Sequence, residues 1–123
     1  MNPLLVFLGG GLGAVARYGV NRLGMLWFGP TVPAGTLTVN ILGSFAMGLL
    51  AALLAEGPAA SQPWRLFLAT GVLGGFTTFS AFSLDALTLW QRGQPGAAAL
   101  YVVGSVLLSL AAIALGFAAA RLA

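Results

Sequence analysis

Four long apolar stretches constrain the fold of this chain more than any other feature. They run from about residue 4 to 27, from 33 to 54, from 63 to 92 and from 95 to 122. About 20 apolar residues in a helix cross the hydrocarbon core of a bilayer, and only 6% of the 123 residues are charged. The sequence therefore predicts an all-α membrane protein, with four transmembrane helices in a single transmembrane domain that covers residues 1–123.

The composition excludes most catalytic chemistry. The chain has no cysteine and no histidine, so it offers no thiolate nucleophile, no imidazole base and no zinc site of the usual kind. We therefore do not expect an enzyme. The five basic residues are scattered, which argues against nucleic-acid binding despite a net charge of +3. The first residues, Met1-Asn2-Pro3, lack the basic start of a secretory leader, so none is expected.

The arginines give almost no signal for orientation in the membrane. Short loops make neighbouring helices antiparallel, which places Arg65 and Arg121 on one side and Arg22 and Arg92 on the other, with Arg17 deeper. An excess of basic residues normally marks the cytoplasmic side. This even distribution therefore predicts insertion in both orientations and pairing as an antiparallel dimer. The alternative is that one orientation dominates.

The third apolar stretch is too long and too rich in glycine for a simple spanning helix. As a helix, residues 63–92 would measure about 45 Å, which exceeds the hydrocarbon core. Residues 74–78 read Gly-Gly-Phe-Thr-Thr, and both glycine and threonine are poor helix formers. We predict a break near 74–78, where freed carbonyls would suit a hard cation. The alternative is an unbroken helix that uses its glycines for close packing.

Small residues also recur at the spacing of one helical face. The pairs are Gly9 with Gly13, Gly71 with Gly75, and Ser44 with Gly48. In lipid, faces of this kind let helix backbones approach each other closely. They predict a tightly packed bundle.

Two polar side chains lie well inside the apolar stretches. Asn40 lies about two helical turns after the start of the second stretch. A buried amide group without hydrogen-bond partners is costly. It must therefore meet water or another helix, and its alternative role is a hydrogen bond between helices. Arg17 is the most expensive residue to bury. Intramembrane arginines usually mark function, although a long side chain can also reach back to the interface.

Hydroxyl and aromatic groups complete a set of donors. Tyr101, Ser105 and Ser109 step by four and form one stripe, while Phe79 and Phe82 are three residues apart and share a face. The alternative role of these rings is to face lipid or to fill the core, but ring edges also carry partial positive charge. Amide, hydroxyl, ring-edge and guanidinium donors without nearby carboxylates suit an anion better than a cation.

Three motifs resemble the family of small fluoride channels called Fluc or CrcB. They are residues 10–18 (GGLGAVARY), residues 35–43 (GTLTVNILG) and residues 74–83 (GGFTTFSAFS). The resemblance covers essentially the whole chain, including its size and its helix layout. The third motif is the most specific of the three.

The resemblance implies an architecture and an activity that spacing alone does not give. Members of the family are dual-topology antiparallel homodimers with two pores. They let fluoride leave the cytoplasm passively and so reduce its toxicity. By this resemblance we expect a channel in the inner membrane of a prokaryote, with a structural sodium ion that is not transported.

The resemblance also assigns roles to single residues. It implies a fluoride pore lined by Asn40, Phe79, Phe82, Tyr101, Ser105 and Ser109. It implies that the backbone carbonyls of Gly74 and Thr77, from both subunits, hold the sodium ion, and that Arg17 lies near an aqueous vestibule. The sequence departs from the family at Ala81, where many members have threonine, and at Asp85, where glutamate is common.

Two other classes of membrane protein compete with this interpretation. Small multidrug exporters have a similar length and helix count, but they depend on a carboxylate deep in the first helix, and residues 4–27 contain no acid. A purely structural membrane subunit would explain the glycine faces. It would not explain the polar stripe or a broken helix.

Overall fold

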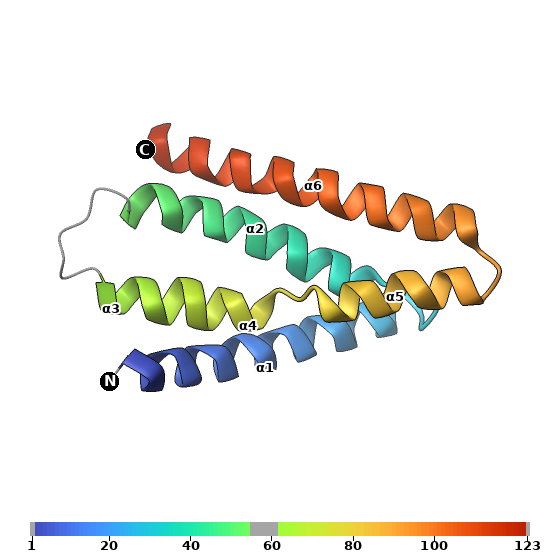
Figure 1. Cartoon of the computed structure of the whole chain (residues 1–123), viewed down its shortest axis with the longest axis horizontal. Helices are drawn as coiled ribbons and strands as arrows, with labels where there is room; N and C mark the ends of the chain where they lie inside the picture. The colour runs from blue at the N-terminus through green and yellow to red at the C-terminus, as the bar shows by residue number, and fades with distance from the viewer. Residues whose placement is uncertain (1, 55–61, 123) are drawn as a thin grey trace.

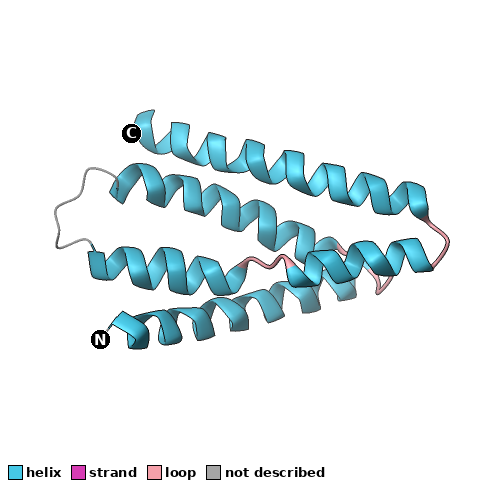
Figure 2. Cartoon of the chain, viewed as in Figure 1, coloured by secondary structure: helices cyan, strands magenta, loops and turns pink. Residues whose placement is uncertain are grey.

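The computed structural model describes residues 2–54 and 62–122 (Figure 1). Within these ranges every regular element is helical and no strand occurs (Figure 2). The elements are α1 (Asn2–Phe28), α2 (Ala34–Leu54), α3 (Gln62–Arg65), the π-helical η2 (Leu66–Leu73), α4 (Gly74–Phe76), α5 (Ser80–Gln91) and α6 (Pro95–Leu122). The prediction of an all-helical chain is confirmed.

Four helical segments are long and apolar enough to cross a membrane. They are Asn2–Phe28, Ala34–Leu54, Pro63–Gln91 and Pro95–Leu122, and the third of them comprises most of α3 together with η2, α4 and α5. The segments run side by side as a bundle, with both chain ends at the same end of it (Figure 1). The chain is therefore a multi-pass membrane protein, as the apolar stretches predicted.

Glycine and proline set the ends of the helices. Gly29 has a φ of 83° and its N–H donates to the Met25 carbonyl at 2.9 Å, which ends α1. Gly93, with a φ of 74°, follows α5 in the same way. Both positions need the left-handed backbone that glycine adopts without strain. Proline cannot supply an N–H to a helix interior, and Pro33 lies just before α2 while Pro95 begins α6.

The bundle packs mainly through its backbones and keeps few large side chains inside. A Cβ atom at Gly48 would collide with the Ile113 carbonyl, and one at Gly116 would collide with the Phe45 carbonyl. These two glycines therefore let α2 and α6 touch. Most large apolar side chains point outward, as expected when the surrounding medium is lipid. Of the largest side chains, only Val39 is fully buried within the described residues.

The third span changes its backbone conformation four times. It begins as α-helix in α3, widens to π-helix in η2, and returns to α-helix in α4, which ends at Phe76. Thr77 then has an extended ψ of 158°, and α5 begins at Ser80. Residues 77–79, which we call the link, are non-helical and lie near the middle of the span (Figure 2). The structure differs from the expected interval of 74–78 in that residues 74–76 are helical.

Candidate functional site

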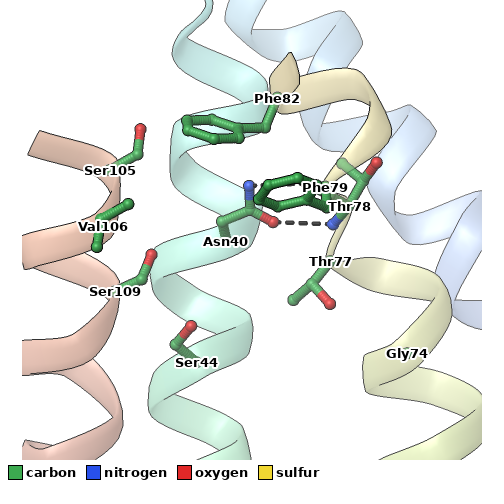
Figure 3. A pocket seen from close by; sticks show the side chains of 10 residues that line it. All are labelled: Asn40, Ser44, Gly74, Thr77, Thr78, Phe79, Phe82, Ser105, Val106 and Ser109. Carbon is green, nitrogen blue, oxygen red and sulfur yellow. Dashed lines mark hydrogen bonds between the residues drawn. The ribbon is translucent and has the colours of Figure 1, made fainter. Parts of the chain in front are cut away.

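A cavity of about 440 Å³ opens beside the link. Its walls come from α2, from the third span and from α6 (Figure 3). The lining residues are Asn40, Ser44, Gly74, Thr77, Thr78, Phe79, Phe82, Ser105, Val106 and Ser109. Seven of the residues that the sequence singled out therefore line one cavity: Asn40, Gly74, Thr77, Phe79, Phe82, Ser105 and Ser109. None of its lining residues is charged.

Both the nitrogen and the oxygen of the Asn40 side-chain amide form hydrogen bonds with the link. Its Nδ2 donates to the Thr78 carbonyl at 3.1 Å, and its Oδ1 accepts the Thr78 N–H at 2.9 Å (Figure 3). A carboxamide has two N–H donors, so one remains beyond the bond to Thr78. Asn40 therefore joins α2 to the third span, which is the alternative role considered for it, and also keeps one donor at the cavity.

Two carbonyls next to the link lose their usual helical donors. The Thr78 N–H, which would bond the Gly74 carbonyl in a continuous helix, bonds Asn40 instead. The Ala81 N–H, which would bond the Thr77 carbonyl, bonds the Thr78 Oγ1 at 3.1 Å. Gly74 is exposed on the surface of the chain. The interruption thus leaves backbone oxygens available at one place in the bundle.

An aromatic row runs from the mouth of the cavity into the protein. The ring centroids of Phe79 and Phe82 are 5.5 Å apart, and those of Phe82 and Tyr101 are 5.3 Å apart. Phe82 and Tyr101 are each 8% exposed, whereas Phe79 is 77% exposed. Phe79 therefore projects from the chain at the edge of the cavity.

The polar stripe on α6 has members in different environments. Ser105 is 4% exposed, and its Oγ has no hydrogen-bond partner among the described residues. Ser109 is half-buried and lines the cavity with it. Tyr101 does not line this cavity; its hydroxyl donates to Asp85 Oδ2 at 3.2 Å. A buried hydroxyl without a hydrogen-bond partner is costly. The Ser105 hydroxyl would therefore be stabilised by an ion or water molecule that accepts its hydrogen bond in the cavity.

A second, larger cavity adjoins the first. Its volume is about 740 Å³, and Ser105 lines both cavities. Tyr101 lines the larger one, together with mostly apolar residues from the end of α1, the α1–α2 loop, α2, α5 and α6 and the turn between the last two. Ser105 therefore lines both cavities, whereas Tyr101 lines only the larger one.

Arg17 does not line the cavity. It lies half-buried on α1, and its Nε donates to the Gly75 carbonyl at 3.1 Å. The sequence placed Arg17 near an aqueous vestibule by resemblance, without a hydrogen-bond partner. In the structure Arg17 lies on the α4 side of the link, and its place near a vestibule stays a prediction.

Ser44, Thr78 and Val106 line the cavity although the sequence assigned them no role in the pore. Ser44 lies four residues after Asn40 on α2, so helical spacing would have placed it on the same face. Thr78 lay within the expected break and bonds Asn40 and Ala81. Val106 has no polar group, and nothing in the sequence distinguishes it from its neighbours on α6.

The chain matches known proteins over nearly all of its length. Residues 4–117 match the family described as "CrcB-like protein, Camphor Resistance (CrcB)". The chain is 54% identical over 121 residues to "Fluoride-specific ion channel FluC 2" of Nitrobacter hamburgensis, with 98% of each chain covered. It is 59% identical over 119 residues to "Fluoride-specific ion channel FluC" of Paracoccus denitrificans, with 96% of this chain and 93% of that one covered.

Proposed function

Because the chain belongs to the CrcB-like protein family, we propose that it is a fluoride-selective channel through which fluoride leaves the cytoplasm passively. The observation that carries this proposal is the uncharged cavity beside the link, in which the Ser105 hydroxyl is buried without a partner. The family consists of ion channels, so the protein is not an enzyme. Membership in it also sets aside the multidrug exporter and the structural subunit.

The chemistry of the cavity fits a small, strongly hydrated anion. An ion that leaves water needs replacement donors at once, because an unpaired charge in a low-dielectric interior is very costly. The cavity supplies the serine hydroxyls, the remaining N–H of Asn40 and the edges of Phe79 and Phe82, which carry partial positive charge. Its lining residues include no carboxylate that would repel an anion. Uncharged donors bind the ion weakly enough to release it, which conduction requires.

The assembly that we propose is an antiparallel homodimer of two chains inserted in opposite orientations. Three observations support a second copy: Phe79 is 77% exposed at the cavity edge, Gly74 is exposed beside it, and the arginines favour neither side. A second chain would cover the exposed ring and close the cavity into a pore. We place the dimer in the inner membrane of a prokaryote, since the matched relatives are bacterial.

We further propose that a structural sodium ion, which is not transported, is held by the carbonyls of Gly74 and Thr77. The described residues contain no group of three His, Cys, Asp or Glu side chains that could hold a metal. The two carbonyls fit a hard cation, because their helical N–H donors are engaged by Asn40 and Thr78. When bound, the ion would add a fixed positive charge near the pore.

The experiment that tests the proposed function is an anion-efflux measurement on vesicles that contain the purified protein. A fluoride electrode is expected to record rapid efflux, and a chloride electrode on matched vesicles is expected to record none beyond that of protein-free vesicles. The reason is that the smaller anion is the more strongly hydrated one and approaches the hydroxyl and ring-edge donors of the cavity more closely. Vesicles impermeable to fluoride, or equally permeable to chloride, would refute the proposal.

Replacing Ser105 should separate function from stability. The Ser105→Ala change removes a buried hydroxyl that has no partner, so we expect stability to rise by about 1 kcal/mol, measured as resistance to unfolding by detergent. Fluoride efflux should fall about fivefold, because an anion in the cavity loses one donor. Ser83→Ala on α5 is the control, since its exposed hydroxyl bonds the Phe79 carbonyl within its own helix end. A Ser105→Ala protein with lower stability and unchanged efflux would contradict the role of this hydroxyl.

A further inference from the structure

Arg17 is the charged side chain nearest to the link on α1, and it is bonded to the third span. Its Nε–H donates to the Gly75 carbonyl at 3.1 Å, across 58 residues of sequence. Gly75 is the second-last residue of α4. The last four carbonyls of a helix have no donor within it. Arg17 therefore supplies a donor to an oxygen that the end of the helix leaves open.

The packing of α1 explains why Arg17 reaches this oxygen. Gly9, Gly13 and Arg17 are four residues apart and lie on one face of α1. A Cβ atom at Gly13 would collide with the Val72 carbonyl, and one at Gly75 would collide with the Gly10 carbonyl. The two backbones are thus in direct contact along this face. Arg17 continues this face to the place where the third span turns into the link.

The electrostatics favour a cation at this place. The carbonyl end of a helix carries about half a negative elementary charge, and a basic side chain there is stabilising. A hydrogen bond from a charged donor is also stronger than one between neutral groups. Since α4 is the carbonyl end of a helical rod that begins at Gln62, the charge of Arg17 lies where that rod ends. An arginine inside the membrane is thereby accounted for without contact to a transported ion.

We propose that Arg17 is a positioning residue that holds the end of α4 and so fixes the conformation of the link. Arg17 and Asn40 hold the link at two places. Arg17 bonds the Gly75 carbonyl just before the link, and Asn40 bonds Thr78 within it. The inference rests on the proposed function, because the link contributes Thr77, Thr78 and Phe79 to the cavity through which fluoride is proposed to pass. The bond itself is independent of any ion.

Amide hydrogen exchange measures this role directly. The amides to follow are those of Thr77, Thr78 and Ala81, whose N–H groups bond Leu73, Asn40 and Thr78 respectively. In Arg17→Gln we expect them to exchange about tenfold faster than in the unaltered protein, since local opening is no longer opposed by a charged hydrogen bond. Arg17→Lys keeps the charge, and its exchange should lie between the two.

Arg22 provides the matched control. It lies on the same helix, is exposed, and donates to the Tyr18 hydroxyl at 3.5 Å within α1. Arg22→Gln removes the same charge and should leave exchange at the link unchanged. Equal exchange in Arg17→Gln and Arg22→Gln would overturn the proposal, even if fluoride efflux were lost, because Arg17 would then act on the ion and not on the link.

A second pair of variants tests the proposal if the first does not fold. If Arg17→Gln does not yield folded protein, Arg17→Lys is compared with Arg22→Lys, and faster exchange at the link is expected only in the former. Equal exchange in that pair would also overturn the proposal. Amide exchange is measured without fluoride, so it tests the role of Arg17 independently of transport. If the protein passes no fluoride, the proposed function is refuted, and the exchange rates still show whether Arg17 holds the link.

Discussion

Fluoride efflux from vesicles that contain Asn40→Ala is expected to fall by about 100-fold relative to the unaltered protein. Two losses combine in this variant. An anion in the cavity loses the N–H that the amide keeps beyond its bond to Thr78, and the link loses both of its bonds to α2. The Thr78 N–H and carbonyl are then left without the partners that hold them. The fluoride electrode measures the rate directly.

Two other variants separate these losses. Ser44→Ala removes one cavity hydroxyl, one turn further along α2, without touching the bonds that hold the link, so its efflux should fall far less than that of Asn40→Ala. Asn40→Asp keeps an oxygen for the Thr78 N–H but replaces the N–H donors with negative charge. It should therefore lose efflux while the Thr78 amide stays protected from exchange. Normal efflux in Asn40→Ala would exclude this residue from the pore.

The four spans could be predicted from the sequence because they follow from hydropathy alone. A continuous apolar stretch of this length that crosses lipid by itself satisfies its backbone groups as a helix. The helix ends followed from similarly local signals, such as the glycine after α1 and the proline that begins α6. None of these features depends on which helices touch.

The hydrogen-bond partners of the polar residues could not be predicted, because they depend on packing. The sequence indicated that Asn40 needs a partner, but its bond to Thr78 requires that α2 approach the link. Gly43 allows that approach, since a Cβ atom there would collide with the Thr77 side chain. Likewise, spacing placed Tyr101 with the serines of α6, yet it could not show that its hydroxyl donates to Asp85.

The π-helical segment η2 lacks a sequence signature altogether. Its residues, Leu66–Leu73, would fit an α-helix equally well by propensity. In a π-helix each bond reaches five residues back, and the Gly74 N–H indeed bonds the Ala69 carbonyl. The extra residue in each π-helical turn rotates the side chains that follow about the helix axis, including those of the helical residues 74–76. The sequence therefore could not give the bounds of the helical and non-helical residues in this span.

Replacing Phe79 is expected to impair efflux without affecting the fold. Its side chain is 77% exposed, so Phe79→Ala removes little packing within one chain and should leave the stability of the isolated subunit nearly unchanged. Fluoride efflux should nevertheless fall about 30-fold, because the anion loses a ring edge and the cavity admits water. Phe82 would lose its aromatic neighbour at 5.5 Å in the same variant.

The control for Phe79 is a phenylalanine of equal exposure elsewhere. Phe7 on α1 is 75% exposed and does not line the cavity, so Phe7→Ala should change neither efflux nor stability. Phe79→Leu tests the chemistry of the ring, because it keeps much of the apolar bulk but has no aromatic edge. If Phe79→Leu conducts as well as the unaltered protein, bulk alone suffices and the ring edge does not stabilise the anion. Efflux near that of Phe79→Ala would instead show that an apolar side chain without a positive edge cannot replace the water that fluoride leaves behind.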